Sequence, residues 1–217
     1  DKITETATSV VGNRTSELSA AVNTIIDTTL PVPVFVGPAF TNSTTPTFTG
    51  TYSDANGVAS VKVSIDGGPQ QTATLNAGTW SFTSTTLTTG THTIVVTATD
   101  NAGNVASTTS SNVVVDITNP VVNYTPIALT NDSTPTLTGT YSDASGVASV
   151  TVSIDGGVQQ AATLNAGSWS FTSTALTNGT HTVVVTATDN AGNVTSTTSS
   201  NIIIDLTNPS VNYTPIA

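Results

Sequence analysis

The chain has 217 residues, 36% of them hydrophobic, and a formal net charge of −10, because thirteen acidic residues face three basic ones. This composition can fill one large core or two small ones, and it argues against a disordered tail. The basic residues Lys2, Arg14 and Lys62 are too few to neutralise nucleic-acid phosphates or to hold an anionic membrane. The absence of Cys excludes disulfides and thiolate metal sites, and no apolar run is long enough to span a bilayer.

An internal repeat organises the chain. Residues 45–120 and 134–209 differ at 14 of 76 positions and are offset by 89 residues. This period is that of a whole small domain and not of a solenoid unit. In chain order we expect the last strands of a preceding domain at 1–26, complete repeats at 27–115 and 116–204, and the first strand of a following repeat at 205–217. We interpret the chain as a piece of a longer array.

Within one repeat, runs of Val, Ile, Thr, Tyr and Phe alternate with Gly, Asn, Asp and Pro clusters every eight to twelve residues. This spacing is typical of an antiparallel β-sandwich, and no segment shows a convincing helical period. The pattern predicts an all-β fold of tandem seven-stranded sandwiches. The seven strands of the first repeat are expected at Val32–Val36, Thr45–Tyr52, Val58–Ile65, Gln71–Leu75, Thr79–Thr85, His92–Thr99 and Val105–Val115.

The joined motifs GTYSDANGVASVKVSIDGG, GTWSF, GTHT, ATDNAGN and VVVDITNP resemble the bacterial immunoglobulin-like repeats of large secreted surface proteins and repeat adhesins. The resemblance covers nearly the whole chain. It implies a cell-surface or extracellular array, often exported without a cleaved signal, with Ca²⁺ between domains and no catalysis. The partners expected for such a module are the neighbouring repeats of the same chain, with no nucleic acid and no inserted membrane segment.

The acidic residues recur at the repeat spacing, since nine of the eleven Asp residues have counterparts one repeat away. In a seven-stranded sandwich the loops after the second and sixth strands lie at the end where the chain enters. The Asp residues of these loops and of the junction should therefore converge, whereas Asp66 and Asp155 turn at the opposite end. Carboxylates brought together without a cation repel one another, and Ca²⁺ takes six to eight oxygen ligands. The predicted Ca²⁺ ligands are Asp27, Asp54, Asn56, Asp100, Asn104, Asp116, Asp143, Asp189, Asn193 and Asp205.

A simpler interpretation is that these Asp and Asn residues only form tight turns, bonding their own backbone. The junction motif D-x-T-x-P, which no hairpin requires, and the scarcity of Lys and Arg favour the metal. In the second repeat Ser145 replaces Asn56, so any role of Asn56 must be dispensable or belong to its backbone.

Other residues point less clearly to function. His92 and His181 are alone in each repeat and fit strand-end positions, Trp80 and Trp169 fit core positions, and no nucleophile motif indicates an enzyme. The sequence therefore favours a structural spacer of a bacterial surface or secreted adhesin. Two alternatives stay open: a module that binds a glycan or host protein, and a filament or sheath subunit that pairs strands between chains.

Overall fold

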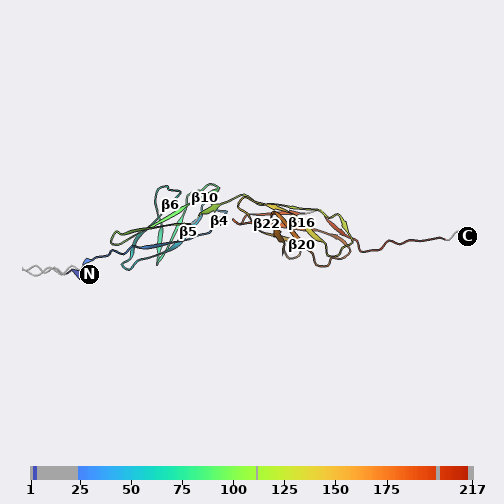
Figure 1. The fold of residues 1–217 in the computed structure, drawn as a ribbon, viewed down its shortest axis with the longest axis horizontal. Helices are drawn as coiled ribbons and strands as arrows, with labels where there is room; N and C mark the ends of the chain where they lie inside the picture. Colours follow the sequence, from blue (N-terminus) through green and yellow to red (C-terminus); the bar gives the residue numbers. More distant parts are fainter. Residues whose placement is uncertain (1, 4–23, 111, 199–200, 215–217) are drawn as a thin grey trace, which may run out of the picture. The chain divides into compact units, whose positions relative to one another are not determined.

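The computed structural model describes residues 2–3, 24–110, 112–198 and 201–214, and every regular element in these ranges is a β-strand (Figure 1). The all-β fold predicted from the alternating pattern is confirmed. Strands β1 (Lys2–Ile3) and β2 (Thr24–Ile25) pair antiparallel. Most of the segment 1–26, which we predict to end a preceding domain, lies outside the described residues.

The first repeat forms two four-stranded sheets with the orders β3-β5-β9-β8 and β12-β11-β6-β7, and a small sheet with the order β10-β13-β4. Its strands are β3 (Val32–Val36), β4 (Phe40–Thr41), β5 (Thr47–Ser53), β6 (Val58–Ile65), β7 (Gln71–Thr72), β8 (Thr74–Asn76), β9 (Thr79–Thr83), β10 (Gly90–His92), β11 (Ile94–Asp100), β12 (Val105–Thr109) and β13 (Val113–Val115).

The second repeat forms the matching sheets β14-β16-β20-β19, β18-β17-β22-β23 and β15-β24-β21. Its strands are β14 (Val121–Tyr124), β15 (Leu129–Thr130), β16 (Thr136–Ser142), β17 (Val147–Ile154), β18 (Gln160–Ala161), β19 (Thr163–Asn165), β20 (Ser168–Thr172), β21 (Gly179–His181), β22 (Val183–Asp189), β23 (Val194–Thr198) and β24 (Ile202–Ile204).

The chain divides into two compact units. The first comprises Asp1–Gly37, Thr47–Ser84 and His92–Asn112, and the second comprises Pro38–Pro46, Thr85–Thr91 and Val113–Ala217. Strands β4 and β13 therefore belong to the same unit as the whole second repeat.

The structure divides several strands that the sequence pattern predicts as continuous. The predicted strand Gln71–Leu75 becomes β7 and β8, which belong to different sheets. The break falls at Ala73, which is buried and donates its N–H to the carbonyl of Val61 at 2.9 Å. The predicted strand Val105–Val115 is likewise divided into β12 and β13. A simple alternation of residues cannot show where a strand changes its partner sheet.

The pattern also missed β4, which pairs parallel with β13 through Phe40 and Val114, while the pairings within the two four-stranded sheets of this repeat are antiparallel. Gly37 and Pro38 separate β3 from β4, and Pro has no N–H to continue a ladder. The chain therefore leaves one sheet after β3 and joins the small sheet at β4.

The core of the second repeat combines inward residues of both large sheets. Leu137 and Trp169 come from one sheet, Val152 and Val185 come from the other, and all are buried in one apolar cluster. The Trp169 indole N–H donates to the Asn123 carbonyl at 3.0 Å, so its polar atom is satisfied. The predicted core position of this Trp is confirmed, and Trp80 is buried in the same way in the first repeat.

Strand register places the candidate site. β6 and β11 pair antiparallel, with Val58 opposite Asp100 and a bulge between Thr99 and Asp100. The loop that precedes β6 therefore lies beside the end of β11. The second repeat has the same arrangement, with Val147 opposite Asp189. Bulges of this kind re-aim a side chain at the end of a strand.

Candidate metal centre

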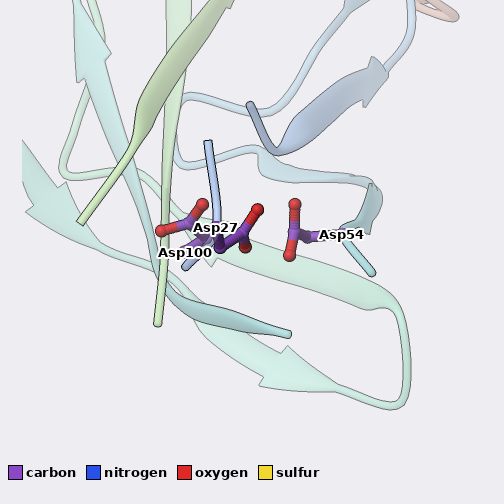
Figure 2. Close-up of side chains that lie close together, drawn as sticks. All are labelled: Asp27, Asp54 and Asp100. Atoms are coloured by element: carbon purple, nitrogen blue, oxygen red, sulfur yellow. The ribbon is translucent and has the colours of Figure 1, made fainter. Parts of the chain in front are cut away.

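Three carboxylates of the first repeat lie together. Asp27 precedes β3, Asp54 lies in the loop between β5 and β6, and Asp100 ends β11. One carboxylate oxygen from each lies within 4.8 Å of the others, and Figure 2 shows the three side chains side by side. We name this group the Asp27 cluster. The three segments, far apart in the sequence, converge as the sandwich topology predicts.

The second repeat has the equivalent group, here named the Asp116 cluster. It consists of Asp116, Asp143 and Asp189, again with one oxygen of each within 4.8 Å of the others. Asp116 and Asp189 are buried, with exposed fractions of 4% and 2%, and Asp143 is half-buried. The same arrangement therefore occurs twice, one repeat apart.

Asp100 and Asp189 build the frame of each cluster. Oδ1 of Asp100 accepts the backbone N–H groups of Ala102 and Asn104 at 2.9 and 2.8 Å. Oδ2 of Asp100 accepts the side-chain amide of Asn104 at 2.8 Å. Burial by itself raises the pKa of Asp100, but these hydrogen bonds outweigh it and lower the pKa. The carboxylate is therefore ionised and its loop is closed around it.

Asn104 and Asn193 each connect the carboxylate at the end of a strand to the junction residue of the same cluster. The Nδ2 of Asn193 donates to Oδ2 of Asp189 and to the backbone carbonyl of Asp116, both at 2.8 Å. Asn104 makes the same two contacts in the first repeat, with Asp100 and with the carbonyl of Asp27. An amide nitrogen donates hydrogen bonds and does not bind cations. These contacts position the junction strand and leave Oδ1 of each Asn, so the role of Asn104 and Asn193 as ligands stays a prediction.

Asp54 and Asp143 sit in turns of matching geometry. Oδ1 of Asp143 accepts the backbone N–H and the hydroxyl of Ser145, both at 2.8 Å. Oδ1 of Asp54 accepts the backbone N–H of Asn56 at 2.8 Å. The simpler interpretation of these residues as turn formers is thus correct for their Oδ1 atoms. It leaves unexplained why three such turns bring their carboxylates together.

The junction carboxylates have an unsatisfied oxygen. Hydrogen bonds from Thr29 lower the pKa of Asp27, and the backbone N–H of Thr118 is the main cause that lowers the pKa of Asp116. Both Asp residues are therefore ionised at neutral pH. Their Oδ2 atoms are buried without a hydrogen-bond partner among the described residues. A buried charged oxygen without a partner is costly, and a cation would satisfy it.

Asn56 and Ser145 are interchangeable at one position. The side chain of Asn56 contributes to the lowered pKa of Asp27, and that of Ser145 contributes to the lowered pKa of Asp116. The Ser145 hydroxyl itself donates to Oδ1 of Asp143 at 2.8 Å. Each repeat thus places a polar side chain near the junction carboxylate, which explains how different residues are tolerated there.

Among the described residues, no basic side chain neutralises either cluster. The ion pairs in that part of the chain are His92 with Asp66 and His181 with Asp155, and neither pair includes a cluster carboxylate. Each cluster therefore gathers three acidic groups with no counter-charge among the described residues.

Asp205 marks the junction after the second repeat. Its Oδ1 accepts the backbone N–H of Thr207 at 3.0 Å, as in the other junctions, and this bond and the Thr207 hydroxyl lower its pKa. Asp205 is exposed, and the described residues bring no second and third acidic group to it. Its role as a ligand stays a prediction.

The two His–Asp pairs are the feature that the sequence interpretation missed. His92 and His181 are buried, with exposed fractions of 7%, and each lies 2.6 Å from a carboxylate oxygen of Asp66 or Asp155. The available signal was strand pairing: β6 and β11 put Ile65 opposite Ile94, which brings Asp66, directly after Ile65, close to His92, two residues before Ile94.

Comparison with protein families identifies the domain type. Residues 38–117 and 128–206 both match the family model of the bacterial Ig-like domain. The chain belongs to the bacterial Ig-like family. The two matches cover most of the sequence, and the resemblance drawn from the sequence motifs is confirmed.

One solved structure supports the fold of these Ig-like repeats, and two adhesin repeats show a more distant similarity. The fibronectin(III)-like modules of Clostridium thermocellum CbhA share 17% identity over 84% of this chain and 100% of theirs, with a TM-score of 0.54. A tetra-tandem repeat from the extending region of a large adhesion protein shares 26% identity (TM-score 0.35), covering 82% of this chain and 49% of that one. A 1.5-MDa bacterial ice-binding adhesin shares 24% identity (TM-score 0.39), covering 74% and 58%.

No curated protein matches this Ig-like chain. The described residues contain no helix long and apolar enough to cross a membrane.

Proposed function

We propose that this chain is a structural spacer of a bacterial surface or secreted adhesin, in which Ca²⁺ stiffens the junctions between Ig-like repeats. The tandem, nearly identical repeats of the bacterial Ig-like family support the spacer role, since duplication extends length without adding a specialised site. The proposed role is non-catalytic and extracellular, and its proposed partners are neighbouring repeats of the same array.

The observation that carries the proposal is the state of Asp116. This carboxylate is 4% exposed, its Oδ2 has no hydrogen-bond partner, and it lies beside Asp143 and Asp189. Turn formation requires only Oδ1, which accepts the N–H of Thr118 at 2.8 Å. The remaining oxygens of the three carboxylates suit Ca²⁺, which binds hard oxygen ligands and tolerates flexible geometry.

The main chain of Asp116 explains why an ion here would act on the junction. Its N–H donates to the carbonyl of Thr41 in β4 at 2.9 Å, directly after the parallel pair of β4 and β13. Its carbonyl accepts Nδ2 of Asn193, in the loop between β22 and β23. A cation held by the Asp116 side chain would therefore fasten the end of β13 to the loops of the second repeat.

The residues that would hold the ion are the three carboxylates of each cluster. Asn56, Asn104, Ser145 and Asn193 would orient these carboxylates. When bound, Ca²⁺ supplies positive charge and satisfies the unpartnered Oδ2 atoms of Asp27 and Asp116.

Thermal unfolding with saturating Ca²⁺ and with excess chelator tests this proposal. At a Ca²⁺ concentration 100 times Kd, one site adds about 2.7 kcal/mol. We expect Ca²⁺ to raise the Tm of the chain, small-angle scattering to show a stiffer particle, and Asp116→Asn to remove both effects at this junction.

Asp132→Asn is the matched control. Asp132 also accepts the N–H two residues ahead at 2.8 Å, but it is exposed and belongs to neither cluster. This variant should keep the full response to Ca²⁺. An unchanged Tm and particle dimension in wild type would contradict the stiffening role.

A further inference from the structure

A second charged arrangement lies at the other end of strand β17 from the Asp116 cluster. His181 ends β21 and is buried, and both of its ring nitrogens have an oxygen within hydrogen-bond distance. Nδ1 lies 2.6 Å from Oδ2 of Asp155, and Nε2 lies 2.9 Å from the backbone carbonyl of Thr177. The first repeat has the same Nδ1 contact, between His92 and Asp66.

The acceptors fix the proton count of the ring. A carbonyl oxygen only accepts, so Nε2 of His181 must carry a hydrogen. Asp155 is half-exposed, and its Oδ1 accepts the backbone N–H of Thr182 at 2.8 Å. The hydrogen bond to His181 is the main cause that lowers the pKa of Asp155. An ionised carboxylate only accepts, so Nδ1 also carries a hydrogen and the ring is an imidazolium.

Asp155 is the charged group that acts on the ring. The neighbours of His181 from the other packed elements are apolar or uncharged: Ile202 lies opposite it on β24, and Thr177 and Thr182 flank it. The hydrogen bond from His181 to Asp155 is the largest cause that raises the pKa of His181, followed by the bond to the Thr177 carbonyl, while burial opposes both. The hydrogen-bond geometry and the nearby Asp155 carboxylate therefore both favour the protonated form of His181.

The loop held by His181 also contacts the outgoing junction. Thr177, whose carbonyl the ring binds, is followed by Asn178. Oδ1 of Asn178 accepts the backbone N–H of Leu206 at 2.6 Å, one residue after the junction residue Asp205. Thr177 in this loop is thus bound by the Nε2–H of His181, and Asn178 in the same loop binds the backbone of the junction at Leu206.

We propose that His181 and Asp155 form a proton-dependent clamp, in which the imidazolium fixes the loop 177–181 against the outgoing junction and alkaline deprotonation loosens it. A histidine whose pKa is raised by folding contributes stability below its unfolded pKa of about 6.5 and loses it as pH rises through the folded pKa. The clamp carries its own cation, so it works without Ca²⁺.

The test is a pH titration of the full chain by NMR, with chelator present. The chain has two His residues, so His181→Gln assigns both side-chain signals. We expect the ¹⁵N shifts of His181 to report two protonated nitrogens at pH 6 and a midpoint above that of an unperturbed histidine. The Leu206 amide signal should titrate with the same midpoint.

Two variants make the result decisive. Asp155→Asn should lower the His181 midpoint to about 6.5 or below and leave that of His92 unchanged. Asn suits this position because Asp155 has a φ of 52°, which Asn tolerates. Asn178→Thr copies Thr89 of the first repeat and should uncouple Leu206 from the titration while preserving the His181 midpoint.

A His181 midpoint at or below 6.5 in wild type, or one that Asp155→Asn does not move, would overturn the proposal. So would a Leu206 amide that does not follow His181, because the clamp would then not reach the junction. Since Ca²⁺ is absent throughout, these outcomes are independent of the spacer proposal.

Discussion

The two ends of strand β17 each carry an acidic residue, Asp143 before it and Asp155 after it, and the charges around these two carboxylates differ. Before the strand, Asp143 joins two other carboxylates, and no basic group among the described residues forms an ion pair with them. After the strand, Asp155 meets a buried imidazole at 2.6 Å. Under the proposed function a cation from solution would supply the counter-charge of the first arrangement, whereas a protonated side chain supplies that of the second. Acidic residues in similar loops thus differ in their counter-charge, and the group without one is the group that we propose to bind Ca²⁺.

The largest effect is expected from Asp189→Ala, which tests whether Asp189 holds its loop by hydrogen bonds in addition to any role as a ligand. The variant leaves the backbone N–H of Asn193 without its acceptor and removes one of the two acceptors of its Nδ2, and unsatisfied buried donors cost about 1–3 kcal/mol each. We expect a loss of about 3 kcal/mol in the free energy of unfolding, with and without Ca²⁺. Chemical denaturation measures it, and a loss confined to the Ca²⁺ condition would show that Asp189 acts only as a ligand.

Asp143→Asn is expected to change the sign of its effect with the cation. Without Ca²⁺ the variant removes the repulsion between the half-buried carboxylate of Asp143 and the buried carboxylates of Asp116 and Asp189. About 1 kcal/mol in the free energy of unfolding is gained per close pair. With saturating Ca²⁺ it removes a ligand and should destabilise the chain by a similar amount or more. Unfolding of wild type and variant in chelator and in Ca²⁺ tests this reversal. An effect of the same sign in both conditions would contradict a cation site.

The pH dependence should separate the two ends. The pKa of Asp116 is lowered, so its contribution is present above the unfolded pKa and is lost as pH falls through the folded value. The pKa of His181 is raised, so its contribution is lost as pH rises. In chelator, His181→Gln should flatten only the alkaline side of the stability profile, by less than about 1 kcal/mol because Asp155 is half-exposed. A flattened acid side would contradict the assignment.

The smallest effect is expected where the two clusters differ. Asn56→Ser and Ser145→Asn exchange side chains that each contribute to the lowered pKa of the junction carboxylate. We expect the Ca²⁺ affinity of each cluster to change by less than about threefold, which corresponds to a few tenths of a kcal/mol. Isothermal titration calorimetry of both variants with Ca²⁺ measures the change in affinity. A tenfold loss would show that the side chain at this position is a ligand.

Much of this arrangement follows from the sequence, because it depends on local patterns. Alternating Val and Thr predict the strands, and the repeated positions of Asp27, Asp54 and Asp100 in loops at one end predict their convergence. Ca²⁺ binding itself stays a prediction. The Asn56 side chain, whose role the sequence left open, contributes to the lowered pKa of Asp27.

The remaining features depend on which atoms face one another. The orientation of the Asn193 amide and the burial of His181 require the register between strands, which a single alternating pattern does not determine. The exchange of partner sheets at Ala73 has the same cause. The His–Asp pairs were missed because Asp155 and His181 are brought together by β17 and β22, whose pairing is non-local.

Calorimetric titration of the chain with Ca²⁺ tests the central claim most directly, using wild type, Asp54→Asn and Asp143→Asn. The account predicts two sites in wild type, one in each variant, and none in the double variant. Binding that is absent in wild type, or that survives in the double variant, would contradict the assignment of the two carboxylate clusters as the metal sites.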